Sequence, residues 1–252
     1  MLTYELSTIS VDKLVGYSIF PIFIRNGDRL VQIIFRCDDY WMVNKPAGMS
    51  FHAESDEVGM MQSLANMHPD VTFYPVHRLD KMTSGLLIVA CNKEAAATFG
   101  EKFEKHDIEK RYLAISKRKP KKKQGTVSGG MQPSRRGQWK LTQEAKNFAV
   151  TQFFSSAFQG NRVFLVRPLT GKTHQIRVAL KSIGSPILGD SRYGGDESDR
   201  GYLHAYALWF EWNGEVRRYT CLPESGDGFS SDFTDFVNTQ FDESLLKWPS
   251  KK

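Results

Sequence analysis

A single carboxylate lies among basic side chains, directly before an apolar run, in the stretch 77–90, which reads HRLDKMTSGLLIVA. Asp80 is the only acidic residue of this stretch, and His77, Arg78 and Lys81 lie close to it in sequence. The apolar run lacks polar alternation and follows a Thr-Ser-Gly turn, which predicts a buried strand. A loop at the mouth of a central strand holds a reactive group rigidly. Asp80 is therefore our candidate reactive carboxylate.

Two other interpretations of this stretch are open at the level of its residues. A His, an Arg and an Asp before a strand also form a solvated turn with a local ion pair, worth roughly a few tenths of a kcal/mol. Metal ligation by His77 and Asp80 is disfavoured, because Arg78 and Lys81 would place positive charge beside the metal. We expect neither a metal nor a cofactor.

A second polar cluster lies in the stretch 168–178, PLTGKTHQIRV. Apolar residues recur there at helical spacing, and Gly184 closes the predicted helix of 176–183. Lys172, His174 and Arg177 crowd its N-terminal end, where the helix macrodipole disfavours cations. An anion should therefore lie at this end, either a carboxylate or an RNA phosphate.

The triplet 171–173, Gly-Lys-Thr, also ends the phosphate loop of nucleotide-hydrolysing proteins. That loop needs a glycine five residues before its last glycine. Val166 occupies the matching position, and the approach to the triplet lacks a glycine-rich cradle. We therefore exclude a nucleotide hydrolase.

The composition limits the class of protein. The chain has 252 residues, of which 40% are hydrophobic and 25% charged, as in soluble globular proteins with a sizeable core. A formal charge of +6 favours acidic partners, nucleic acid first. Three scattered cysteines disfavour a disulfide framework or a structural zinc site. No apolar run reaches membrane-spanning length and no signal-peptide pattern begins the chain, so we expect a cytoplasmic protein.

The densest basic block of the chain is the segment 117–123. The block and the glycine-rich segment after it contribute five candidate RNA-binding residues: Lys121, Lys122, Lys123, Arg135 and Arg136. A solvated basic loop is one interpretation. We favour a phosphate-binding flap, because each Lys or Arg placed on a phosphate releases a counterion.

Short strands and helices must position these residues. Period two over 109–115 places Leu113 and Ile115 on one face, and Tyr112 with Lys110 on the other. The remaining apolar patterns predict strands over 31–35, 40–43, 147–154 and 162–167, a helix over 93–105, and a C-terminal helix after Ser231 and Asp232.

Four stretches, in order along the chain, resemble the motifs of the RluA family of RNA pseudouridine synthases. They are NKPAG from position 44 with His52 after it, HRLDKMTSGLL from 77, KRYLA from 110 and TGKTHQIR from 170. The turn 184–194 and the triplet 203–205 resemble the pieces that follow in the family. Lys172 replaces an arginine of the motif, and Ala179 stands where a histidine is common. The resemblance covers roughly residues 31–222.

The resemblance implies conversion of uridine to pseudouridine in RNA, a reaction that breaks N1–C1′, turns the base and joins C5 to C1′. It assigns the nucleophile to Asp80, stacking on the base to Tyr112 and pairing with Asp80 to Arg177. A close guanidinium keeps a carboxylate ionised. Three routes stay open, because Asp80 can attack the sugar, attack the base or abstract a sugar proton.

Further residues are expected to bind the RNA. Arg78 would occupy the space that the extruded nucleotide leaves, because base chemistry within a stem requires flipping. Lys45 would contact a phosphate or lie exposed in its turn. We add His77, Lys172 and His174 from the two main motifs.

We expect an α+β fold with a mixed, largely antiparallel central sheet flanked by helices. Residues 1–30 form an N-terminal segment of unknown role, too short for the separate RNA-binding domain that many relatives carry. Residues 31–252 form the catalytic domain with its C-terminal helix, a monomer that acts on rRNA or tRNA. The alternative is a non-catalytic RNA-binding module, which the joint presence of Asp80, Tyr112 and Arg177 disfavours.

Overall fold

The computed structural model describes residues 22–26, 29–53 and 57–249. In this part of the chain twelve strands form one sheet. The strands are β1 Ile22–Asn26, β2 Arg29–Arg36, β3 Tyr40–Lys45, β4 Tyr74–Pro75, β5 Ser84–Ala90, β6 Glu109–Ser116, β7 Gln124–Pro133, β8 Trp139–Thr142, β9 Phe148–Phe158, β10 Asn161–Pro168, β11 Leu203–Trp212 and β12 Glu215–Thr220.

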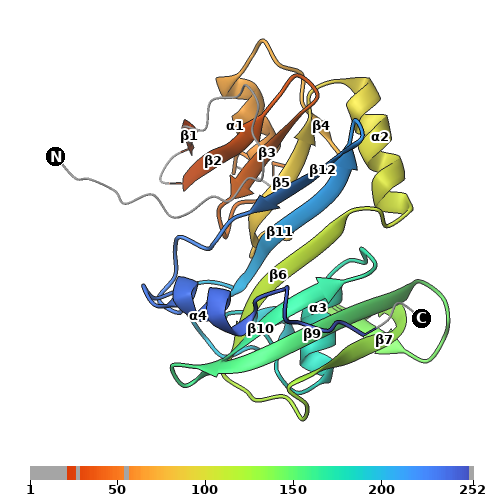
Figure 1. Ribbon diagram of the computed structural model, residues 1–252, viewed down its shortest axis with the longest axis vertical. Coiled ribbons are helices and arrows are strands. Elements are labelled where there is room, and N and C mark those ends of the chain that lie inside the picture. The colour runs from red at the N-terminus through yellow and green to blue at the C-terminus, as the bar shows by residue number, and fades with distance from the viewer. Residues whose placement is uncertain (1–21, 27–28, 54–56, 250–252) are drawn as a thin grey trace.

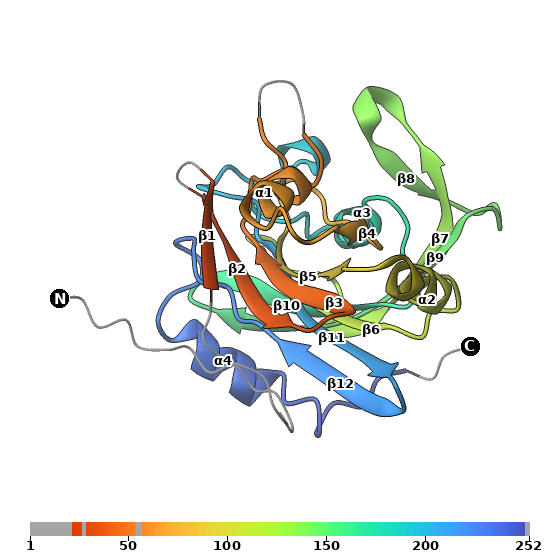
Figure 2. The same ribbon diagram turned by 90° about the horizontal axis from the view of Figure 1, so that it is seen from above.

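Helices lie on both faces of this sheet. Figure 2 shows α1 and α3 on one side and α4 on the other. The helical elements are α1 Met60–Met67, α2 Lys93–Glu104, α3 Gln175–Ser182, α4 Phe233–Gln240 and the short 3-10 turns η1 Arg135–Gly137 and η2 Ser191–Tyr193.

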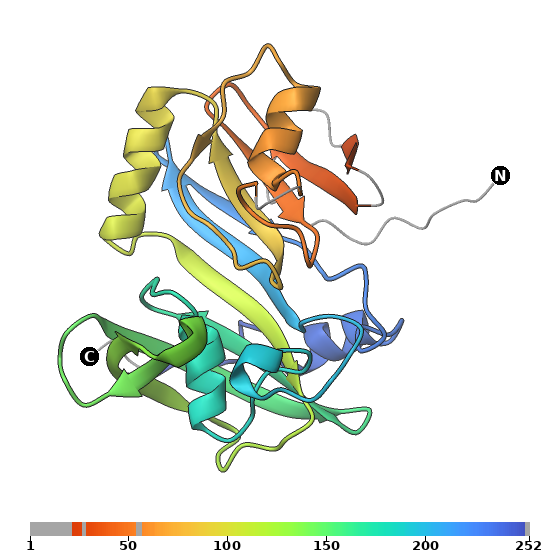
Figure 3. The same cartoon turned by 180° about the vertical axis from the view of Figure 1, so that it is seen from behind.

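The sheet is antiparallel at every pairing except one. Its order is β1-β2-β3-β5-β11-β6-β10-β9-β7-β8, with β12 on β11 and β4 on β5. Among the described strands only β5 and β11 run parallel, and they pair over two residues. The predicted α+β fold, a mixed and largely antiparallel sheet flanked by helices, is confirmed. Strands β6 and β11 lie between a half with β1–β5 and a half with β7–β10 (Figures 1 and 3).

The predicted buried strand of 86–90 is the centre of the first half. Every residue of β5 is buried, because β3 and β11 flank it and side chains cover both of its faces. Leu86 and Ile88 face the cluster that α2 closes with Phe99, whereas Leu87 and Val89 face the cluster of α1. The non-alternating apolar pattern is the pattern of such a strand.

The predicted strands and helices are present, with small differences at their ends. Strand β2 begins at Arg29, two residues before the expected start of the catalytic domain, and β1 pairs with it. Residues 1–21 and 27–28 of the N-terminal segment of unknown role lie outside the described residues. Helix α4 packs Phe233 and Val237 into the core cluster that also holds residues of β6 and β10.

Candidate active site

Asp80 lies in a tight turn just before β5. The backbone N–H of Thr83 donates to the Asp80 carbonyl at 3.0 Å, which closes the turn. Gly85 then has φ +108, and a Cβ there would lie 2.3 Å from the Ala205 carbonyl oxygen of the neighbouring strand. Only glycine lets β5 approach β11 this closely. The turn is therefore fixed by the parallel contact at the sheet's centre.

Lys45 is buried and stabilises this turn through its hydrogen bonds. The prediction that it contacts a phosphate or lies exposed is therefore wrong. The side chain has no exposed surface, and its ammonium donates to the carbonyls of Pro46, Met49 and Lys81 at 3.0, 2.7 and 3.3 Å. A lysine buried against three carbonyls is out of reach of a phosphate. It instead ties the turn of residues 46–49 to the residue after Asp80.

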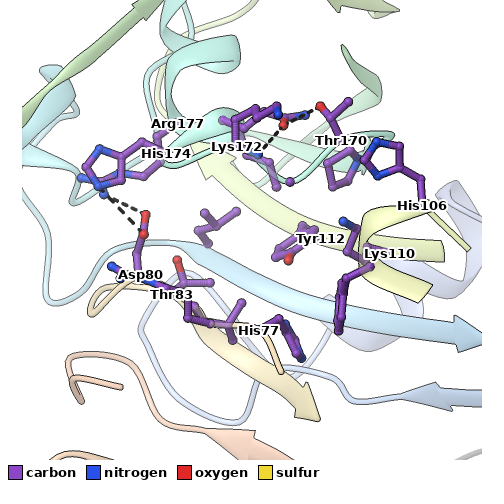
Figure 4. A pocket seen from close by; sticks show the side chains of 18 of the residues that line it. His77, Asp80, Thr83, His106, Lys110, Tyr112, Thr170, Lys172, His174 and Arg177 are labelled. Carbon is purple, nitrogen blue, oxygen red and sulfur yellow. Dashed lines mark hydrogen bonds and ion pairs between the residues drawn. The ribbon is translucent and has the colours of Figure 1, made fainter. Parts of the chain in front are cut away.

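Arg177 joins two carboxylates at the N-terminal end of α3. Its Nη1 donates to Asp80 Oδ2 at 2.9 Å, whereas Nε and Nη2 form a fork on Asp190 at 2.7 and 2.8 Å. The predicted contact between Asp80 and Arg177 is confirmed (Figure 4). The Asp190 side chain is 1% exposed and the Asp80 side chain 21% exposed. Asp190 thus orients the guanidinium, and Asp80 keeps an open side toward the cleft.

His174 approaches Asp80 from the same end of α3. It adopts a left-handed backbone conformation, with φ 56, as the residue before the helix. Its Nδ1 lies 2.8 Å from the Tyr193 hydroxyl, which already accepts a hydrogen bond from the N–H of Trp139. The hydroxyl hydrogen is then available to Nδ1, and in the tautomer that accepts it the ring proton lies on Nε2, 3.9 Å from Asp80 Oδ1. Burial lowers the pKa of His174, although the Asp80 charge opposes this effect.

Tyr112 lies on the wall of the inner pocket, a cavity of about 580 Å³ that also contains Asp80 and Arg177. It projects from β6 on the face opposite Leu113 and Ile115, as the period of two predicts. Burial raises the pKa of Tyr112, and the Asp80 charge adds to the effect. A neutral phenol ring beside a carboxylate offers a flat surface for a base.

A second cavity, the outer pocket of about 620 Å³, adjoins the inner pocket, and Asp80, Arg78, His174 and Arg177 line both. Arg192 and Arg200 line the outer pocket as well. Arg78 is exposed where it lines both pockets. Lys172 lines the inner pocket, where its backbone N–H donates to the Gln175 side chain. Asp80 therefore lies where the two cavities meet.

His77 lines the inner pocket but is held as a neutral ring. Its Nε2 accepts a hydrogen bond of 2.9 Å from the N–H of Ile88, and its ring packs against Phe103. Burial lowers the pKa of His77 to about 3, and the charge of Lys110 adds to the effect. A neutral, anchored histidine is not a phosphate-binding cation, which limits the role predicted for it to shaping the pocket.

The basic block does not reach the pockets that meet at Asp80. Lys121, Lys122 and Lys123 are exposed on the loop before β7, and Arg135 and Arg136 are exposed in η1 between β7 and β8. None of the five lines the inner or the outer pocket. The glycine-rich segment is a β-hairpin that projects on the same side of the sheet as α1 (Figure 2). Arg192 donates to the carbonyl of Gly137 and so joins this hairpin to the outer pocket.

The sequence analysis did not identify the residues that orient the site residues through hydrogen bonds. Asp190 and Tyr193 lie in an irregular turn without periodicity, and only the anion expected near Arg177 pointed to a partner of this kind. His204 was also missed: its Nε2 donates to the Cys221 carbonyl and its Nδ1 accepts from Ser84, both at 2.8 Å. Arg200 donates to the same Ser84 hydroxyl.

Neither a metal-ligand cluster nor a membrane-spanning helix occurs among the described residues. No cluster of three or more possible metal ligands occurs among them. Of the helices in these residues, none is long and apolar enough to cross a membrane.

Comparison with known proteins identifies the family. Residues 39–182 match the model of the RNA pseudouridylate synthase family. An uncharacterized RNA pseudouridine synthase of Haemophilus influenzae is 46% identical over 199 residues, which cover 78% of this chain and 89% of the relative. The chain belongs to the RNA pseudouridylate synthase family, and its reaction is the isomerisation of uridine to pseudouridine in RNA.

Two further relatives carry the names of their RNA substrates. The ribosomal large subunit pseudouridine synthase C of Rickettsia bellii is 35% identical over 184 residues, 69% of this chain and 61% of the relative. The tRNA pseudouridine synthase C of Haemophilus ducreyi is 34% identical over 182 residues, 65% of this chain and 74% of the relative.

Solved structures confirm the fold. Human RNA pseudouridylate synthase domain containing 1 superposes with a TM-score of 0.68 at 22% identity, over 94% of this chain and all of that one (100%). Human RNA pseudouridylate synthase domain containing 4 gives 0.63 at 24% identity, over 82% of this chain and 91% of that one. At these identities the likeness concerns the fold alone.

Proposed function

We propose that Asp80 is the nucleophile with which this pseudouridine synthase isomerises a uridine in rRNA or tRNA. The observation that carries this assignment is the ion pair of 2.9 Å with Arg177, on a carboxylate that still faces two cavities. Asp190 holds the guanidinium in place, so the Asp80 carboxylate is aimed before substrate arrives. Such preorganisation lowers the cost of reaching the transition state.

The two cavities divide the target nucleotide between them. We assign the uracil to the inner pocket, where Tyr112 offers its ring, and the flanking phosphates to the outer pocket with Arg78, Arg192 and Arg200. The ribose then lies at Asp80, where the cavities meet. Because this geometry accepts a single nucleotide away from its stack, the uridine must be flipped out of the RNA. Arg78 is exposed beside Asp80 and takes the place that the nucleotide leaves.

Lys172 and the basic block would bind the RNA around the target nucleotide. Lys172 lines the inner pocket, whereas Lys121–Lys123 and η1 lie outside both pockets. Contacts outside the pockets bind phosphates without reading sequence. They add affinity for any RNA that extends beyond the target site.

We also propose that the active unit is a cytoplasmic monomer. The three cysteines are free thiols, as in a reducing compartment. Residues 31–252 would form the catalytic domain, with the β1–β2 pairing continuing the sheet toward the N-terminal segment 1–30. Light scattering of the purified protein tests the monomer.

The RNA class is tested by mapping pseudouridines in rRNA and tRNA from cells with and without this protein. We expect one or a few positions, in one RNA class, to lose pseudouridine when the protein is absent. Their return with the wild-type chain assigns the substrate. An unchanged map in both classes would contradict a substrate in rRNA or tRNA.

A further inference from the structure

Lys110 is a cation of the inner pocket that the assignments above leave without a task. It projects from β6 two residues before Tyr112, on the same face, and both residues line this pocket. Its Nζ lies 5.9 Å from the centre of the Phe103 ring and 3.7 Å from where a Cβ on Gly171 would be. Figure 4 shows Lys110 further from Asp80 than Tyr112 is.

Other basic side chains near Lys110 in the fold have carboxylate partners, whereas Lys110 forms no ion pair with any carboxylate in the described part of the chain. Arg111 pairs with Glu109 and Glu243, and Arg167 pairs with Glu109, on the other side of the sheet. For Lys110, burial lowers the pKa to about 8, and no carboxylate raises it again. The ammonium is still largely protonated at neutral pH. Its one aromatic contact is near the limit of a cation–π interaction and offsets little of the desolvation. Such a residue destabilises the empty pocket, so a bound anion is the partner it suits.

The chemistry of the reaction supplies such an anion at this position. Breakage of N1–C1′ leaves the electron pair on the uracil, whose charge spreads to its carbonyl oxygens, until C5 bonds to C1′, C5 loses its proton and N1 gains one. Addition of a carboxylate to the base likewise places charge on a carbonyl oxygen. The base is therefore anionic on each of the three routes open to Asp80.

We propose that Lys110 is a catalytic residue whose ammonium binds a carbonyl oxygen of the uracil and stabilises the negative charge that develops there. Residues i and i+2 of a strand lie about 6.6 Å apart on one face, within the span of a lysine stem and a pyrimidine ring. A base stacked on Tyr112 thus brings its polar edge to Lys110. This inference rests on the proposed assignment of the uracil to the inner pocket.

The test replaces Lys110 by methionine, which keeps the length of the side chain and removes its charge. In single turnovers with enzyme in excess over RNA, Lys110→Met should slow pseudouridine formation about 10²–10³-fold, the range for loss of a preorganised charge-stabilising group. RNA affinity should stay within about threefold, and the melting temperature should not fall, because a buried cation is removed. Lys110→Arg keeps the charge and should recover most of the rate.

Two control variants make the outcome specific. Lys105 pairs with Glu101 on the surface and does not line the inner pocket, so Lys105→Met should leave the rate unchanged. Asp80→Asn tests the assignment of the nucleophile separately. An unchanged rate in Lys110→Met beside an inactive Asp80→Asn would overturn the role of Lys110 alone. The role of Lys110 would also be overturned if Lys110→Met lost rate only in proportion to its loss of stability or RNA affinity. The same holds if Lys110→Arg were as slow as Lys110→Met.

Discussion

At the scale of single residues, the site depends on one guanidinium that serves two carboxylates with different tasks. Asp190 is almost fully buried and receives the fork of Arg177, whereas Asp80 receives one Nη and keeps an open side. The cations at the helix N-terminus predicted an anion there, and the family resemblance implied that Asp80 is this anion. The second partner did not follow from the sequence, since Asp190 lies in an irregular turn whose path depends on packing against α3.

Arg177→Met separates these two tasks. It leaves the Asp190 carboxylate buried without a partner, which should destabilise the fold by about 3–5 kcal/mol, and it should abolish activity. Adding Asp190→Asn removes the buried charge and should restore most of the unfolding free energy but no activity. Denaturant titrations and product assays of both variants check this. Recovery of activity in the double variant would show that Arg177 has a purely structural role.

At the scale of elements, the turn that carries Asp80 is held between the end of β3 and the start of β5. Lys45 and Gly48 both donate to the carbonyl of Lys81, beside Asp80. The sequence shows a lysine and a tight turn there, but not whether the ammonium faces solvent or carbonyls. That choice depends on how β3 and β5 pair, which the residue types alone do not specify. The motifs therefore located the site better than they distinguished supporting residues from binding residues.

Lys45→Met and neutralisation of the basic block should differ in how they change the salt dependence of RNA binding. Lys45→Met leaves buried carbonyls without a donor, so it should cost about 1–3 kcal/mol of stability and reduce turnover. It should not change the slope of log affinity against log salt.

Replacing Lys121, Lys122 and Lys123 by glutamine should flatten that slope and weaken binding to all RNAs alike. A flatter slope in Lys45→Met would return Lys45 to a phosphate contact, and an unchanged slope in the triple variant would leave the basic block a solvated loop.

At the scale of the whole molecule, half-buried His77 and fully buried His204 hold the strands around the site together as neutral rings. His77 accepts from Ile88, and His204 joins Ser84 of β5 to Cys221. Burial lowers the pKa of each to about 3. The buried strand β5 was predictable from its unbroken apolar pattern, whereas the order of the strands in the sheet was not. The crossing of β11 beside β5, which buries His204, is a long-range pairing that no local pattern of the sequence contains.

These histidines should make the fold sensitive to acid. An unfolded histidine has a pKa of about 6.5, so below that pH the unfolded chain binds more protons than the folded one. The stabilisation is complete above pH 6.5 and is lost as the pH falls toward 3. Between pH 7 and pH 5 each histidine should cost about 2 kcal/mol. Denaturant titrations across this range check this. Replacing His77 and His204 by glutamine should flatten the dependence, whereas replacing the exposed His52 should not, and an equal slope in all three proteins would contradict this explanation.

The central claim is that the Asp80 carboxylate performs the isomerisation. The most direct measurement is release of tritium from RNA labelled at C5 of its uridines, because C5 loses its hydrogen when it bonds to C1′. With the RNA found by mapping, wild-type protein should release the label in step with pseudouridine formation. Asp80→Asn should bind this RNA with similar affinity, keep its melting temperature within a few degrees and release no label. Tritium release by Asp80→Asn at a rate near that of the wild type would contradict the account.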